Sequence, residues 1–209
     1  MTTFRVLEGI TPGPPTASAN DSLPYTLGVE FTVSEPCTLT KIHIWQPSTG
    51  PISTADRTVG VWENTNGTNG DLMGTTELLS VSGSGWQTRT LTSPKSLVTG
   101  VRYVAGVFYP AGQYVATSNY FNSDIVSGPV TYLSNSNSFA GQMKFSTGST
   151  FSFPGNTFNS ANYWIDITVE TGESLPLSGF VSHNGSEWVQ AYGWAHNGAN
   201  WVRATPAPL

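Results

Sequence analysis

The sequence has few charged residues, and basic residues are the scarcest. Only 10% of its 209 residues are charged. The chain has 8 Lys and Arg and 13 Asp and Glu, which gives a net charge of −5. An average globular domain has about 25% charged residues. Because affinity for nucleic acids depends mainly on Lys and Arg side chains, this composition argues against a nucleic-acid partner.

Long apolar runs and paired cysteines are also missing. No apolar stretch approaches the roughly 18 residues that a membrane span requires, so we expect no membrane insertion. The single cysteine, Cys37, cannot form a disulfide within the chain, which fits folding in a reducing compartment. The first ten residues lack the basic and apolar regions of a signal peptide, so we do not expect export by the general secretory route.

What the sequence does contain is a series of short segments with the period of β-strands. Leu27, Val29, Phe31 and Val33 alternate with smaller or polar residues, which predicts a half-buried strand. Val101–Tyr109 is apolar at nearly every position, which predicts a central strand buried on both faces.

Two further segments add to this pattern. In Leu39–Gln46, Ile42 and Ile44 share one face, opposite Lys41, His43 and Trp45. In Tyr163–Glu170, alternation places one set of side chains inward, namely Tyr163, Ile165, Ile167 and Val169. It places the other set outward, namely Trp164, Asp166 and Thr168.

No segment of useful length has a helical period. Short strands separated by Gly, Pro and Asn at intervals of about 8–12 residues are typical of all-β folds. We therefore predict an antiparallel β-sandwich, jelly-roll-like, over residues 25–172. An extended N-terminal arm (1–24) would precede it, and a small C-terminal unit of β-hairpins (173–209) would follow.

The two ends differ in composition from the body. Residues 1–24 are rich in Pro, Gly and Ser, and the tail repeats one unit as Ser182–Val189 and Ala195–Val202. Each His-Asn-Gly is expected to turn, and each following Trp-Val to begin the returning strand. Segments this small cannot bury their own apolar side chains, so we predict that they contact neighbouring subunits. The predicted assembly contacts are Phe4, Val6, Leu7, Trp188, Trp194 and Trp201.

Residues 25–170 resemble a bacterial and phage domain of unknown function, the DUF4082 family. The matching segments, in order, are Tyr25–Phe31, Lys41–Ile44, Gly85–Gln87, Tyr103–Ala105, Tyr114–Phe121 and Asn162–Ile167. The resemblance implies a β-sandwich with a binding or structural role, in carbohydrate-associated bacterial proteins or in phage virions. It implies no catalytic residues. The Trp-rich tail is similar to the C-terminal repeats of actinobacteriophage minor tail proteins.

The residues themselves do not form a clear catalytic or metal motif. A glycosidase needs two carboxylates across the scissile bond, and the acids here, such as Glu30, Asp166 and Glu170, are scattered singly. Cys37 follows a proline at a strand start, without a paired motif. The loop Asn64–Asp71 superficially resembles a calcium loop but supplies one carboxylate, so turn chemistry explains it better. We expect no cofactor and no enzymatic activity, and leave open whether this loop holds a calcium ion.

Aromatic residues give the strongest signal, with 7 Trp and 8 Tyr. Flat apolar rings suit the faces of sugars, although each such residue can equally belong to the core. The candidate glycan contacts are Trp45, Trp62, Tyr120, Phe121, Trp164 and Asp166.

The resemblance of the domain and of the tail implies a non-enzymatic phage virion protein, either an exposed minor tail protein or a capsid decoration. It would be made in the host cytoplasm, would bind other capsid or tail subunits as a homo-oligomer, and would contact host-surface glycans. A bacterial carbohydrate-binding or adhesion module is the alternative, and a glycoside hydrolase is a weaker one.

Overall fold

The computed structural model describes residues 1–12, 18–50 and 53–172, together with four short strands in the tail. It divides into two compact units, Thr3–Glu170 and a second made of Met1–Thr2 with Thr171–Leu209. All regular elements in the described part are β-strands. None of its described segments is a helix able to cross a membrane.

The smaller of the two main sheets has four strands, which run along β1-β15-β4-β8. Their bounds are Thr2–Arg5 for β1, Ile165–Thr171 for β15, Cys37–Gln46 for β4 and Gly85–Leu97 for β8. The antiparallel pair β4–β8 forms the long edge of this sheet, with a bulge between Leu39 and Lys41.

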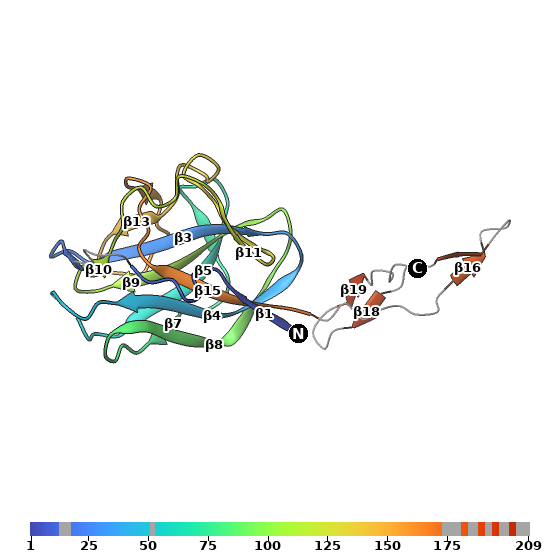
Figure 1. Ribbon diagram of the computed structural model, residues 1–209, viewed down its shortest axis with the longest axis horizontal. Coiled ribbons are helices and arrows are strands. Elements are labelled where there is room, and N and C mark those ends of the chain that lie inside the picture. Colours follow the sequence, from blue (N-terminus) through green and yellow to red (C-terminus); the bar gives the residue numbers. More distant parts are fainter. Residues whose placement is uncertain are drawn as a thin grey trace. The chain divides into compact units, whose positions relative to one another are not determined.

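The larger sheet has nine strands, and six of them follow the order β11-β12-β3-β9-β5-β6. These strands are Ile125–Ser127 (β11), Val130–Tyr132 (β12), Tyr25–Val33 (β3), Arg102–Tyr109 (β9), Arg57–Asn64 (β5) and Gly70–Leu72 (β6). Three shorter strands extend it, namely β13 (Lys144–Thr147) on β3, β14 (Asn156–Thr157) on β13 and β7 (Glu77–Leu79) on β5. The two sheets form two layers with a common apolar core between them (Figure 1). The prediction of an antiparallel β-sandwich is confirmed, as is the central position of β9.

Strands outside the two sheets form three small antiparallel pairs. β2 (Ser18–Asn20) pairs with β10 (Gln113–Val115). In the tail, β16 (Val181–His183) pairs with β17 (Trp188–Gln190), and β18 (Trp194–His196) pairs with β19 (Trp201–Arg203). The predicted returning strands at Trp188 and Trp201 are therefore present.

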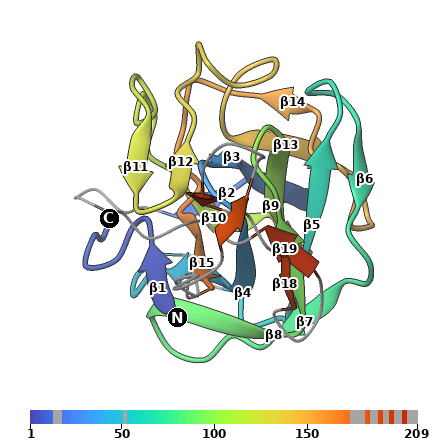
Figure 2. The same ribbon diagram turned by 90° about the vertical axis from the view of Figure 1, so that its right-hand side faces the viewer.

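Strand β3 of the larger sheet is buried on both faces. On β3 the inward Leu27 is 1% exposed, but Glu30, on the opposite face, is fully buried as well. The chain around β13 and β14 lies over β3 and β5 on the side away from β4 and β8 (Figure 2). There, Trp62 of β5 stacks on Phe151 with ring centroids 4.5 Å apart. The expectation of a half-buried β3 was wrong because this chain segment replaces solvent on its outer face.

A side-chain amide fills a gap in the hydrogen-bond ladder of β3. Along one edge of β3, β12 pairs with Phe31–Val33 and β13 with Tyr25–Gly28, so Glu30 faces no strand residue there. The amide of Gln142 takes that place: its Oε1 accepts from the Glu30 N–H at 2.8 Å, and its Nε2 donates to the Glu30 carbonyl at 2.7 Å. The buried backbone at the junction therefore stays paired, as buried polar groups require.

The N-terminal residues belong to the sandwich. β1 is the edge strand beside β15, and Leu7 is fully buried in the core. Phe4 lies against Gly128, where an added Cβ would be 2.1 Å from the ring, at a φ of +54° that suits glycine. Residues 1–24 were predicted to form an extended arm that contacts neighbouring subunits, but Val6 and Leu7 of this segment are buried in the chain's own core.

Ile165 offers a test of the core, because it is fully buried in β15 and was predicted to face inward. We expect Ile165→Ala to lower the free energy of unfolding by about 2–5 kcal/mol, through lost burial and a residual cavity. Urea denaturation measures the change, with Val126→Ala as the control because Val126 is 66% exposed. Equal stability of the two variants would show that Ile165 is not a core residue.

Candidate functional site

A pocket of about 270 Å³ opens in the sandwich near the start of β3. Five separate segments build it: the chain after β2, β3, β10, β13 and the chain before β15. The residues that line this aromatic pocket are Asp21, Tyr25, Leu27, Tyr114, Phe145, Phe158 and Tyr163. Leu27 and Tyr163 are buried, whereas Phe158 is 58% exposed and lies open to solvent.

The rings of the aromatic pocket meet at steep angles. Tyr114 packs edge-on against Tyr25, at 68° and 5.8 Å between centroids, and against Tyr163, at 89° and 5.6 Å. Tyr25 also contacts Phe145 at 59° and 6.2 Å. Edge-to-face packing of this kind is favourable and fixes each ring against its neighbours. The pocket therefore has aromatic walls in several directions, held in place before any ligand enters.

A carboxylate is coupled to these rings. The Tyr114 hydroxyl donates to Asp21 Oδ2 at 2.5 Å. Burial, and then this hydrogen bond, raise the pKa of Tyr114 above its usual value, and burial also raises those of Tyr25 and Tyr163. The three phenols therefore stay neutral and able to donate hydrogen bonds. Among the described residues that line the pocket, Asp21 alone is charged.

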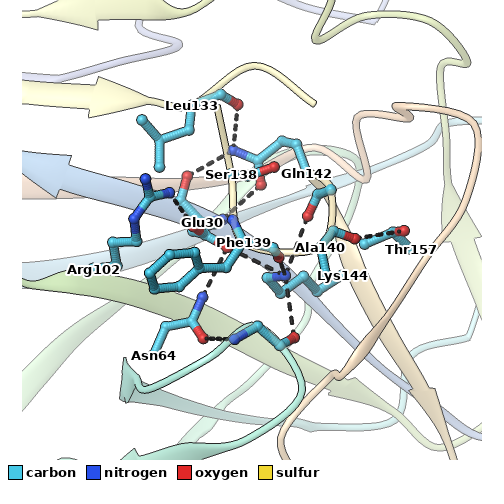
Figure 3. A network of polar contacts seen from close by, with 12 residues as sticks. Glu30, Asn64, Arg102, Leu133, Ser138, Phe139, Ala140, Gln142, Lys144 and Thr157 are labelled. Carbon is cyan, nitrogen blue, oxygen red and sulfur yellow. Dashed lines mark hydrogen bonds and ion pairs between the residues drawn. The ribbon is translucent and has the colours of Figure 1, made fainter. Parts of the chain in front are cut away.

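A second polar cluster lies on the outer face of the larger sheet, and its Glu30, Asn64 and Lys144 side chains are buried (Figure 3). Its centre is the Glu30 carboxylate, whose Oε2 is 3.2 Å from Lys144 Nζ and 2.8 Å from Asn64 Nδ2. Glu30 Oε1 accepts from Arg102 and from the Phe139 N–H, both at 2.9 Å. Each carboxylate oxygen therefore has two partners.

Lys144 extends this Glu30 cluster into two loops. Its Nζ donates to the carbonyls of Gly67, Gly141 and Phe139. Burial lowers the pKa of Lys144, and the Glu30 charge opposes that shift. Gly67 has a φ of +88°, and an added Cβ would lie 2.7 Å from the Phe139 carbonyl oxygen, so only glycine fits. The cluster thus ties the loop after β5 and the loop before β13 to β3.

A second acid considered for catalysis in the sequence, Asp166, is held in a separate network. Its Oδ2 accepts from Arg5 Nε at 2.7 Å and from the Leu7 N–H at 3.2 Å, and its Oδ1 from the Tyr132 hydroxyl at 2.8 Å. Burial raises the pKa of Asp166, although these hydrogen bonds oppose the shift. Asp166 was predicted to face solvent, and that was wrong because the N-terminal segment covers it.

His43 and Cys37 are also enclosed. The His43 ring lies between Thr88 Oγ1, at 2.8 Å from Nδ1, and Thr168 Oγ1, at 2.7 Å from Nε2. Burial, with Arg5 nearby, lowers the pKa of His43 to about 3, so the ring is neutral near pH 7. Burial raises the pKa of the Cys37 thiol to about 11, which keeps it protonated.

Most of the predicted glycan contacts are core residues. Trp62, Phe121, Trp164 and Asp166 are at most 4% exposed, so they present no face to a sugar. The alternation of apolar residues predicted that Trp164 faces solvent, which was wrong. Its backbone has a φ of +54°, which is not that of a β-strand, and its indole N–H donates to Thr117 Oγ1. Two further candidates, Trp45 and Tyr120, are half-buried against other rings, Trp45 on Trp86 and Tyr120 on Phe121 and Trp164. None of the six lines the aromatic pocket.

The predicted assembly contacts divide by position. Val6 and Leu7 are buried within the chain, and Phe4 packs on Gly128, so these three serve the sandwich itself. Trp188, Trp194 and Trp201 stand at the starts of β17, β18 and β19, but their side chains lie outside the described part.

The loop once compared with a calcium site uses its oxygens internally. Asn64 Oδ1 accepts from the Gly67 N–H at 2.8 Å, and Asn66 Oδ1 accepts from the N–H groups of Thr68 and Asn69. Within the described ranges, no group of three or more His, Cys, Asp or Glu residues could hold a metal ion.

Comparison with known proteins gives one match. The family model described as "Domain of unknown function (DUF4082)" matches residues 11–165. No curated protein and no solved structure matches the chain. Because the family model covers well over half of the sequence, the chain belongs to the DUF4082 family, as the sequence resemblance implied.

Proposed function

We propose that this DUF4082 chain is a non-enzymatic binding protein whose sandwich takes a sugar residue of a surface glycan in the aromatic pocket. The observation that carries the proposal is a cavity walled by fixed aromatic rings with one carboxylate beside them. Ligand sites commonly combine apolar and aromatic walls with a few placed polar groups. Here the phenol hydroxyls and Asp21 would supply the polar contacts to hydroxyls.

The state of the acids supports binding over hydrolysis. A glycosidase requires two carboxylates that reach the substrate from either side of the bond. Glu30 and Asp166 are fully buried, and each is saturated by its own partners. Moving either toward a substrate would break several charge-assisted hydrogen bonds, so a hydrolase is the weaker candidate.

We also propose that the tail attaches the protein to a larger assembly, a phage virion, as a tail or capsid component. The two tail repeats form hairpins of the same register, with His183 opposite Trp188 in one and His196 opposite Trp201 in the other. A duplicated, Trp-bearing hairpin suits repeated contacts with other subunits, because Trp is enriched at interfaces. A bacterial adhesion module remains the alternative, and in it the same hairpins would contact a cell-surface partner.

Binding at the aromatic pocket can be tested on an array of bacterial cell-wall glycan fragments. We expect Phe158→Ser to weaken binding about tenfold, because it removes an exposed aromatic wall at little cost in stability. Leu78→Ser is the matched control, since Leu78 is 59% exposed on β7 and does not line the pocket. Glycan binding that both variants retain would place the site elsewhere, and release of reducing ends would contradict a non-enzymatic role.

Attachment through the tail can be tested by ending the chain at Gly172. We expect a folded sandwich that no longer joins the assembly, because residues Thr3–Glu170 form a compact unit with its own core. Circular dichroism checks folding, and occupancy in purified particles measures incorporation. Wild-type occupancy of the shortened chain would show that the tail is not the anchor.

A further inference from the structure

We infer that the aromatic pocket recognises a cationic group on its ligand, a quaternary ammonium or a protonated amine. This inference rests on the proposed function, because it names the chemistry bound at the same pocket. Two independent observations carry it, the arrangement of the rings and the sign of the charge beside them.

Aromatic rings from four segments of the chain line the pocket. A neutral sugar stacks on one flat ring, which presents a single face. In this pocket Tyr114 lies at 68° and Phe145 at 59° to Tyr25, and these three rings are half-buried. The negative face of each aromatic ring attracts a cation, and several faces at steep angles can act on one compact ammonium group. Quaternary ammonium ions are recognised by aromatic cages of this kind.

The charge beside the rings is negative, which attracts a cation. Asp21 is the one charged group among the described lining residues, and Tyr114 holds its carboxylate beside the rings at 2.5 Å. Lys and Arg side chains that would repel a cation are absent from that lining. The whole chain also carries a net charge of −5, which favours the approach of a cation.

The depth of the pocket fits a group with an apolar surface. Leu27 and Tyr163 line the pocket but are only 1% and 4% exposed, so the half-buried rings of the lining supply its accessible wall. Phe158 is the exposed wall, from which the remainder of a larger ligand would extend into solvent. A methylated or primary ammonium substituent on a surface polymer has this combination of positive charge, small size and apolar surface.

The test compares choline with 3,3-dimethylbutan-1-ol, which has the same shape but carbon in place of the charged nitrogen. Titration of the full chain, followed by NMR of the tyrosine ring signals, gives both dissociation constants. We expect choline to bind at least about tenfold more tightly. Asp21→Asn should reduce that ratio severalfold, whereas Asp71→Asn, which removes the same charge on β6 away from the pocket, should preserve it.

Two results would overturn the inference and are distinguishable from failure of the proposed function. Equal affinity for choline and its neutral analogue would show that the pocket recognises the shape of the ligand and not its charge. A glycan whose binding falls in Phe158→Ser but is not displaced by choline would leave the proposed function standing and remove the cation preference. If choline does not bind and no glycan binding depends on Phe158, both proposals fail together.

Discussion

The burial of one carboxylate, Glu30, constrains much of this structure. A charge removed from water is costly unless it is paired and hydrogen-bonded, and Glu30 meets that demand with partners from β5, β9, β13 and the loop before β13. The partners in turn fix the covering chain on the larger sheet. Lys144 and Phe145 are neighbours on β13, so the ion pair on one face also places a wall of the aromatic pocket on the other.

The strands were predictable because their period is a local property. β3, β4, β9 and β15 were recognised from alternating or continuous apolar residues, and Ile165 and Ile167 are buried as that pattern requires. Alternation fails where both faces are covered, because it assigns every second residue to solvent. Trp164 and Asp166 were misplaced for that reason, since the cover is provided by residues far away in the sequence, such as Arg5.

The aromatic pocket was not predictable in the same way. Its residues come from five segments between Asp21 and Tyr163, and no spacing in the sequence links them. The sequence held one weak signal of this pocket, which is that tyrosines stand at the start of β3, within β10 and just before β15. Tryptophans were predicted as glycan contacts from their abundance and presumed exposure, whereas large aromatics such as Trp62 most often serve the core.

The neighbouring positions of β1 and β15 bear on how the molecule is made. Arg5 and Asp166, which join these strands, are 161 residues apart in the chain. Bringing together residues so far apart in the chain has an entropic cost. Such long-range contacts slow folding, as in other β-sandwiches. During synthesis, Leu7 and the far edge of the smaller sheet must wait for β15 to leave the ribosome. Until then the nascent chain exposes an incomplete apolar layer, as chains do before their long-range contacts form.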